Sequence, residues 1–244
     1  MNKDSASPYR GNLKLTGTSS TLGGSYDKVR IVGDAVVSGG IACSEMRCIG
    51  TYDIKGSLGA GSIRLVGDGV SEALRAGTVK LTGKAIVGRD AEIGELSGAG
   101  DVEVGGTLKA GDISLRGSLR VAGDCGAEQF RPKGMFAIGG LLNAGDIDIK
   151  LYQNSSAKEI GGGRIEVARG SVISPLSLVF RPSSDAVLEA SIIEGDDIHL
   201  EHTRAGIVRG SRITIGEGCD IGQVEYKERL DVKRGATVGE QRKV

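Results

Sequence analysis

The chain has 244 residues, and 31 lysine and arginine residues balance 31 aspartate and glutamate residues, so its formal net charge is zero. This balance argues against a nucleic-acid-binding protein that works through bulk positive charge. Glycine contributes 41 residues and aromatic residues only 3%, which argues against an ordinary core of large side chains. Four prolines without a Gly-X-Y period exclude collagen. Small aliphatic residues with frequent glycines favour a β-solenoid.

Residues 1–12 form a short polar tail in the predicted organisation. They contain no apolar run typical of a signal peptide, and no later stretch approaches the roughly 18 apolar residues of a membrane-spanning helix. The four cysteines, Cys43, Cys48, Cys125 and Cys219, are irregularly spaced and do not suggest a disulfide framework. We therefore expect a cytoplasmic protein with reduced thiols.

Residues 13–150 contain short apolar-x-apolar triads in three interleaved series with one period. The first series begins Leu13-Lys14-Leu15, Val29-Arg30-Ile31 and Met46-Arg47-Cys48, and it continues in steps of 16 or 17 residues. Glycines follow these triads at a fixed offset, where sharp corners need a positive φ. Three series with one period predict three short strands in each coil. In each triad the outer residues point inward and the middle residue points outward.

The pattern breaks over residues 151–164, which we interpret as an insertion or connector. Triads resume over residues 165–238, with an interruption around 180–186, and residues 239–244 are read as a tail. The tripeptides Phe130-Arg131-Pro132 and Phe180-Arg181-Pro182 resemble one another, but the sequence assigns them no role. The prediction is an all-β, right-handed parallel β-helix with about 17 residues per three-stranded coil and roughly 13–14 coils.

The sequence predicts no catalytic, cofactor or metal site. Residues 77–84 resemble a phosphate-binding loop, but their glycine spacing is wrong and alanine follows the lysine. His199 and His202 lack a third ligand, and Cys43 and Cys48 occupy inward positions that small buried residues normally fill. Carboxylates are scattered without a cleft that would pair them. We therefore expect no nucleotide, no cofactor and no enzyme activity.

Two enzyme classes use similar rods and remain alternatives. Acyltransferases with left-handed β-helices show one aliphatic residue in every six, whereas this chain has triads and a longer period. Polysaccharide-processing enzymes cluster acidic or basic catalytic residues on one face of a longer rod, and no such catalytic cluster is evident here. A third alternative is a β-helix adaptor that does not polymerise.

The segments Val29–Gly50 and Val102–Asp124, with their glycine corners, resemble the bactofilins, a family of polymer-forming bacterial cytoskeletal proteins. The segment Cys43–Gly50 and the length of the solenoid, with its two segments, are most similar to the longer forms in Bacillus-like bacteria. The resemblance covers Gly11–Gly145 well and Ile165–Val238 loosely. It implies a right-handed β-helix that assembles into filaments without nucleotide. It also implies roles in cell shape, cell-envelope organisation or flagellar motility.

The two ends of the predicted solenoid carry candidate polymer contacts. A solenoid stays monomeric when its ends are capped, and neither end of this sequence shows an amphipathic helix. Open strand edges with an apolar cross-section would template another copy of the chain. The alternative is that residues 2–10 fold over one end. The residues expected at the open ends are Leu13, Leu15, Val232, Ala236 and Val238.

One face carries a column of cations in consecutive coils: Lys14, Arg30, Arg47, Arg64 and Lys80. Thr16, Val32, Ile49, Val66 and Thr82 form a neighbouring outward column. Such a charge run is typical of a solvated face. The alternative is a docking surface for an acidic protein, a neighbouring filament or an anionic membrane, which would place the protein at the inner face of the membrane. Nucleic acid is not an expected partner.

Overall fold

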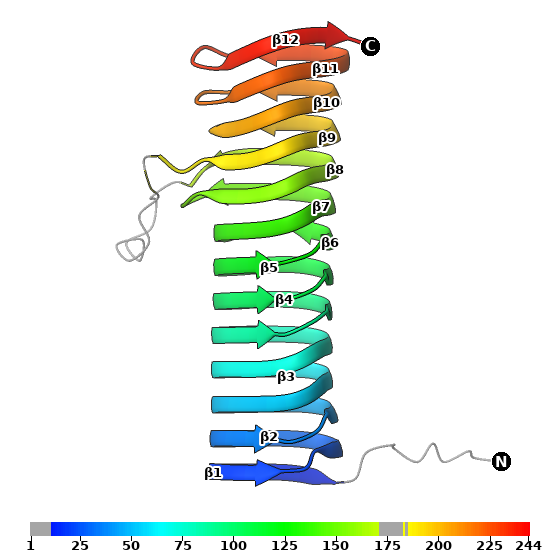
Figure 1. Ribbon diagram of the computed structural model, residues 1–244, viewed down its shortest axis with the longest axis vertical. Coiled ribbons are helices and arrows are strands. Elements are labelled where there is room, and N and C mark those ends of the chain that lie inside the picture. Colours follow the sequence, from blue (N-terminus) through cyan, green and yellow to red (C-terminus); the bar gives the residue numbers. More distant parts are fainter. Residues whose placement is uncertain (1–10, 171–182, 184) are drawn as a thin grey trace, which may run out of the picture.

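Stacked parallel strands form one long rod in the computed structural model, which describes residues 11–170, 183 and 185–244 (Figure 1). The rod has about 13 turns of roughly 17 residues each. Every strand pairs in parallel with its neighbours in sequence, and β5 also pairs with β7. The described strands are β1 Asn12–Thr21, β2 Gly24–Val37, β3 Ile41–Val87, β4 Ala91–Val104, β5 Leu108–Val121, β6 Cys125–Phe130, β7 Lys133–Leu151, β8 Ser155–Arg169, β9 Leu188–Leu200, β10 Thr203–Ile215, β11 Asp220–Val232 and β12 Thr237–Lys243.

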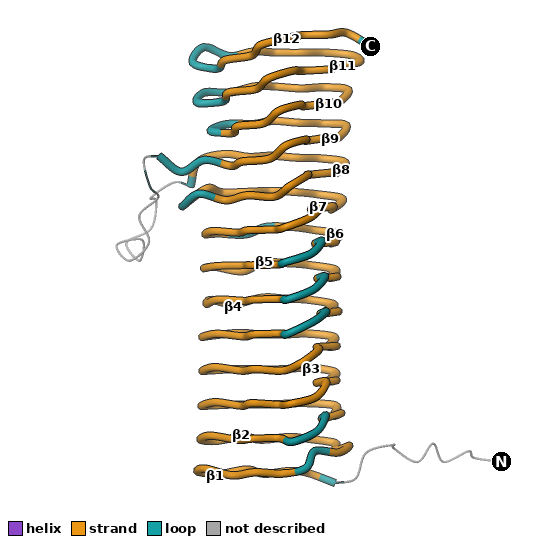
Figure 2. Tube along the Cα trace, in the orientation of Figure 1, coloured by secondary structure: helices purple, strands orange, loops and turns teal. Residues whose placement is uncertain are grey.

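The all-β parallel solenoid predicted from the triads is therefore confirmed. In Figure 1 the near strands run from left to right while the coil rises from the N-terminal to the C-terminal end, which is a right-handed sense. Figure 2 shows that the loops of the described residues lie at the corners of the coil. A coil rise equal to the strand spacing makes the rod about 60 Å long.

The register of the ladder follows the first series of triads. Leu13 pairs with Val29, and Val29 pairs with Met46. Farther along the rod, Leu96 pairs with Ile113, and Ile113 pairs with Phe130. Equivalent residues of successive coils thus stack directly on one another, as the constant period requires.

Glycine at one corner of the coil is a physical necessity. Gly67 has a φ of 126°, a conformation that L side chains rarely adopt. A Cβ atom at Gly67 would lie 2.0 Å from the carbonyl oxygen of Gly50 in the coil below. The same corner is occupied by Gly33, Gly83 and Gly100, which also have positive φ values. The corner glycines therefore allow the backbones of successive coils to approach closely.

The core is the narrow interior of the rod. Leu65 and Leu81 are both 2% exposed, whereas the middle residues of their triads, Arg64 and Lys80, are exposed. The predicted inward and outward positions of these residues are confirmed.

Phe130 and Phe136, together with Tyr52, are large aromatic residues buried in this interior. The two phenylalanines are fully buried, and their rings meet edge to face with centroids 5.3 Å apart. Pro132, which has no N–H for the ladder, lies in the gap between β6 and β7. Phe130-Arg131-Pro132 is therefore a core anchor followed by a strand break, whereas Phe180-Arg181-Pro182 lies outside the described residues.

The predicted insertion over residues 151–164 is wrong. Leu151 ends β7, and Ser155–Arg169 is β8, which pairs with β7 as an ordinary coil. The extra residues come after β8, because Ser155 pairs directly with Leu188 of β9. The apolar-x-apolar pattern did not reveal this coil, because Ser155 is polar although it occupies a buried inward position. Its hydroxyl accepts a hydrogen bond from the Phe136 amide at 3.2 Å.

The predicted C-terminal tail, residues 239–244, is also wrong in most of its length. Strand β12 continues to Lys243, which pairs with Tyr226 of β11. Apart from Gly239 and Val244 this segment consists of polar residues, and most of it lies on a strand at the edge of the rod. It therefore lacks the alternating apolar pattern that identifies the inner coils.

Candidate interaction surfaces

The N-terminal end of the rod is an open strand edge. Within the described residues β1 pairs only with β2, so one side of its backbone has no neighbouring strand. Leu15 is 9% exposed, whereas Ile31, directly above it in the next coil, is 1% exposed. Leu13 is partly buried against the same core. The predicted end contacts Leu13 and Leu15 thus form the outermost apolar layer of the interior among the described residues at this end.

The C-terminal end is open over part of its cross-section. Strand β12 pairs with Asp220–Tyr226 of β11, and within the described residues no strand covers the later part of β11. Val232 in that later part is 38% exposed, whereas Ile215, one coil below, is fully buried. Ala236 and Val238 pack against the core but are partly exposed. The uncovered part of β11 therefore forms a step that exposes core-type side chains.

The two ends present equivalent columns of the coil. The column that starts at Leu13 continues through the stacked triads to Leu230, and the column of Leu15 ends at Val232. The outward residues between them are Lys14 at one end and Asp231 at the other. The two ends thus offer matching apolar side chains and opposite outward charges in the same columns.

Asp231 is an ionised group at the C-terminal end. The hydrogen bond from Lys233 holds the pKa of Asp231 below its usual value, and Arg229 contributes to the same lowering. The carboxylate is therefore negative at neutral pH, and within its own subunit it already pairs with Lys233 at 2.7 Å and with Arg229 at 3.7 Å.

The five cations predicted on one face lie in one column. Lys14 pairs with Arg30 and Arg30 with Arg47 in the parallel register. Arg64 and Lys80 continue the column, because the corner glycines three residues later, Gly50, Gly67 and Gly83, stack on one another. All five side chains are exposed.

The structure adds Lys28 to this set, and we call the group of Lys14, Lys28, Arg30, Arg47, Arg64 and Lys80 the basic face. Lys28 lies two residues before Arg30 on the same strand and is exposed. Lys28 is the residue just before the triad Val29-Arg30-Ile31 and points outward like Arg30. Because side chains alternate between the two sides of a strand, its outward position could have been predicted from the sequence.

Ion pairs are scarce on the basic face. Arg47 pairs with Glu45. For the other cations of the basic face, no ion pair forms among the described residues. Like charges about 4.8 Å apart on adjacent strands repel one another, so this column destabilises the isolated rod slightly.

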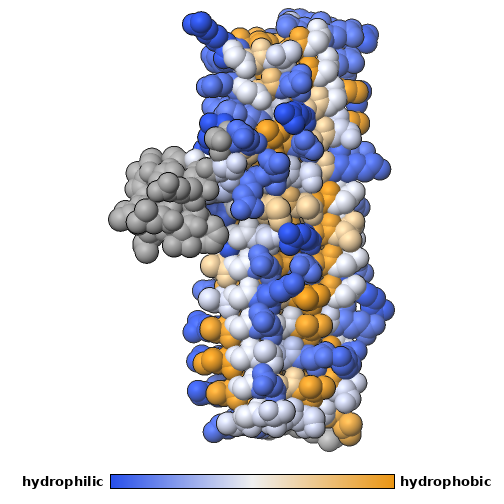
Figure 3. Space-filling model, turned by 60° about the vertical axis from the view of Figure 1, so that its left-hand side comes forward, coloured by the Kyte–Doolittle hydropathy of each residue, from blue (hydrophilic) through white to orange (hydrophobic). Residues whose placement is uncertain are grey.

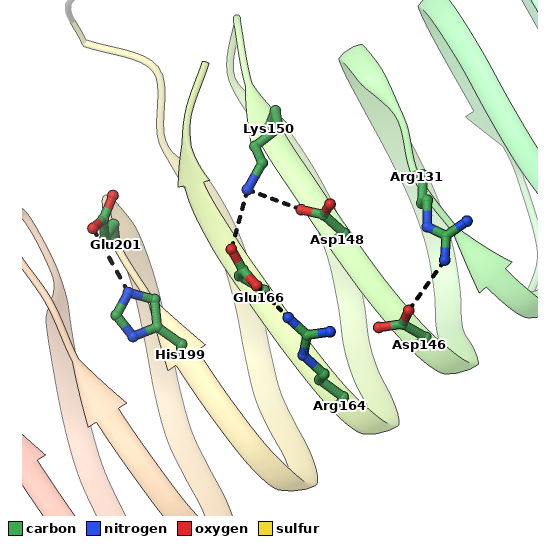
Figure 4. Close-up of polar contacts among 8 residues, drawn as sticks. All are labelled: Arg131, Asp146, Asp148, Lys150, Arg164, Glu166, His199 and Glu201. Carbon is green, nitrogen blue, oxygen red and sulfur yellow. Dashed lines mark hydrogen bonds and ion pairs between the residues drawn. The ribbon is translucent and has the colours of Figure 1, made fainter. Parts of the chain in front are cut away.

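The same columns carry a balanced network in the second half of the rod (Figure 4). Lys150 lies 3.0 Å from the Asp148 carboxylate and 3.2 Å from that of Glu166, and Arg164 also contacts Glu166 at 2.7 Å. The hydrogen bond from Lys150 holds the pKa of Glu166 below its usual value. The second half of the rod thus differs from the basic face in two ways: its outward charges are of both signs, and they pair with one another within the subunit.

Exposed hydrophobic side chains lie near the basic face in two columns, and Asp53 interrupts the second of these where it pairs with Val36. Ile49 is 55% exposed and Val66 is 44% exposed, each two residues after a cation of the face. Val36 and Val70, at 45% and 39%, lie beyond the glycine corner. In Figure 3 hydrophobic side chains form upright columns on the N-terminal part of the rod, separated by hydrophilic ones. The outward column that the sequence placed beside the cations is therefore partly apolar.

The cysteines are core residues, and His199 lies on the surface. All four cysteines are buried, and burial raises the pKa of Cys43 and of Cys48 to about 11. His199 points outward beside Glu201, with 3.6 Å between the imidazole Nε2 and the carboxylate. In the described part of the chain no three His, Cys, Asp or Glu side chains are grouped so as to hold a metal ion. Nor does that part contain a helix of the length and apolarity that crossing a bilayer would require.

These surfaces and the fold define a β-solenoid protein that, over its described residues, has two open ends and one basic face. Part of the chain is similar to two proteins of Bacillus subtilis strain 168. It is 35% identical over 100 residues to the uncharacterized protein YhbF, and 42% identical over 80 residues to the uncharacterized protein YhbE. The alignments cover 40% of both this chain and YhbF, and 32% of both this chain and YhbE. No family model matches the chain, and no solved structure matches it significantly.

Proposed function

We propose that this protein is a scaffold subunit that assembles end to end into filaments without nucleotide. The observation that carries the proposal is the pair of open ends, where Leu15 and Val232 occupy the same column and are more exposed than the residues stacked next to them. Each end alone leaves backbone groups unpaired and apolar side chains in water. Joining two ends removes both costs.

The register supports a head-to-tail junction. In that arrangement β1 of one copy lies on the uncovered part of β11 of the next, so that Leu13 and Leu15 stack on Leu230 and Val232. Lys14 then lies beside Asp231, a pair of opposite charges on neighbouring strands. A contact between two different ends does not close on itself and therefore produces an open filament.

The cellular role follows the resemblance to bactofilins. A cytoplasmic filament of this kind would organise cell-envelope, cell-shape or flagellar-motility components, with no catalytic activity of its own. The alternatives are an adaptor that does not polymerise and, with less support, a β-helix acyltransferase or polysaccharide-processing enzyme. The adaptor would be active as discrete particles, and either enzyme would need a catalytic cluster.

Cysteine crosslinking tests the junction. Residues facing one another on adjacent parallel strands have Cα atoms at a spacing that a disulfide can bridge. We expect a variant with both Lys14→Cys and Asp231→Cys to form a ladder of covalent multimers under mild oxidation. The single variants and the wild type, whose thiols are buried, should not form a ladder.

The single variants also report polarity. Dimers of the Lys14→Cys variant alone would indicate that identical ends meet, which contradicts the head-to-tail register. If the double variant stays monomeric under oxidation at concentrations where the wild type sediments as a polymer, the proposed junction is wrong.

A further inference from the structure

We propose that the basic face, together with Ile49 and Val66, binds the surface of an anionic lipid bilayer. The proposal rests on the filament proposed above, because the face of one subunit is small and gains strength from repetition. It assigns a partner to a side of the rod that end-to-end assembly leaves free.

The first step is charge. The basic face contains six cations in five consecutive coils, and Glu45 is the carboxylate that pairs with one of them. The outward columns of the same face in the second half of the rod pair their charges internally, as at Lys150 and Glu166. Cations without a carboxylate partner are thus stacked in consecutive coils on this half of the face, where an anionic surface complements them.

The second step is shape. The cations stand on a parallel ladder, so the face is flat along the rod and their spacing is that of the strands. A flat array of cations fits an extended plane of negative headgroups. The exposed side chains of Ile49 and Val66 lie in the column next to Arg47 and Arg64.

The third step is the mixed chemistry of the two columns. A bilayer offers phosphate and carboxylate groups to the cations and, just beneath them, apolar material to branched side chains. A nucleic acid backbone would leave Ile49 and Val66 without a partner. Proteins that bind single-stranded nucleic acids usually offer aromatic side chains on which the bases stack, and the basic face contains no aromatic residue. The bilayer is therefore the partner that uses both columns.

Repetition makes the interaction effective. In a head-to-tail filament the basic face recurs about every 60 Å along the rod axis. Several weak sites on one rigid body bind a surface far more tightly than a single subunit does. The filament would thus lie along the membrane, and the subunit alone would bind weakly.

Flotation of assembled filaments with vesicles tests the proposal, because filaments without lipid sediment whereas vesicles rise. We expect wild-type filaments to float with vesicles of phosphatidylcholine and phosphatidylserine, but not with phosphatidylcholine alone. High salt should release them. The combined variant Arg30→Gln, Arg47→Gln and Arg64→Gln should lose roughly fivefold in affinity per removed cation, the equivalent of about 1 kcal/mol each.

The control variant carries Arg75→Gln, Lys109→Gln and Arg120→Gln, which remove the same charge from the other two faces. It should float like the wild type. A second arm combines Ile49→Thr and Val66→Thr, which should weaken flotation but leave binding to heparin, a soluble polyanion, unchanged.

Three results would overturn the proposal. They are wild-type filaments that do not float, equal losses in the basic-face variant and its control, or flotation that Ile49→Thr with Val66→Thr does not alter. The last result would indicate a general polyanion site rather than a bilayer site. Electron microscopy of the same samples without vesicles reports filament formation separately, so a failure of assembly is distinguishable from a failure of membrane binding.

Discussion

At the scale of single residues, alternation along each strand decides what a side chain does. Neighbours such as Lys80 and Leu81 lie in the same strand, yet Leu81 is 2% exposed and Lys80 points into solvent. We expect Leu81→Asp to lower the free energy of unfolding by several kcal/mol, because it buries an unpaired carboxylate. Lys80→Asp should change it by less than about 1 kcal/mol. Thermal melts of the two variants compare them, and equal destabilisation would contradict the assignment of inside and outside.

The thiols provide a second test at this scale. With a pKa of about 11 for Cys43 and Cys48, roughly one thiol in a thousand is ionised at pH 8, and burial blocks access as well. Burial raises the pKa of Cys125 to about 12. We expect the folded protein to react negligibly with a thiol reagent at pH 8 and to release all four thiols after denaturation. Rapid reaction of the native protein would show that these cysteines are not core residues.

Residue-scale predictions from the sequence succeeded where the periodic pattern is clean. Arg64 and Leu65 could be assigned to opposite sides from alternation alone, and the same rule would have identified Lys28. Ser155 could not be assigned, because its buried hydroxyl depends on hydrogen bonds to Phe136 and Gln153. Such bonds form only after the chain has coiled.

At the scale of the coil, the glycine corners are the elements that set the stacking distance. Gly67→Ala would place a Cβ atom 2.0 Å from the Gly50 carbonyl oxygen at a φ of 126°. We expect the free energy of unfolding to fall by about 1–3 kcal/mol or more. Gly126→Ala is the matched control, because nothing lies within 4 Å of its Cβ position. Denaturant titration compares them, and equal midpoints would show that the corners do not limit the stacking.

Element boundaries were harder to predict than the repeat itself. The period identified the coils up to residue 150 because each carries apolar triads and corner glycines. It failed at β8, where the coil steps lengthen and polar residues replace part of the core. It also failed at β12, where Val238 packs against the core but the later residues are polar and pair through the backbone. Hydrogen bonds between backbones do not require particular side chains. A strand of polar residues at the edge of the rod therefore cannot be told from an unstructured tail by its sequence pattern.

At the scale of the whole molecule, the open ends determine whether rods join. Leu15→Arg or Val232→Arg would place a charge in the apolar layer of the junction, and either should shorten or abolish polymers. Circular dichroism should change little, because the inner coils are untouched. Thr82→Arg, which adds the same charge at an outward position of an inner coil opposite Ala99, is the control and should assemble normally. Sedimentation velocity measures the outcome, and unchanged polymer size in both end variants would argue against end-to-end growth.

Electron microscopy of the purified protein without nucleotide shows whether the rods join end to end. We expect unbranched filaments one rod wide, with a subunit repeat of about 60 Å along the axis, the length of about 13 coils at the strand spacing. The repeat should be polar, because each junction joins an N-terminal end to a C-terminal end. Discrete particles one rod long at every protein concentration would show that the protein does not assemble end to end.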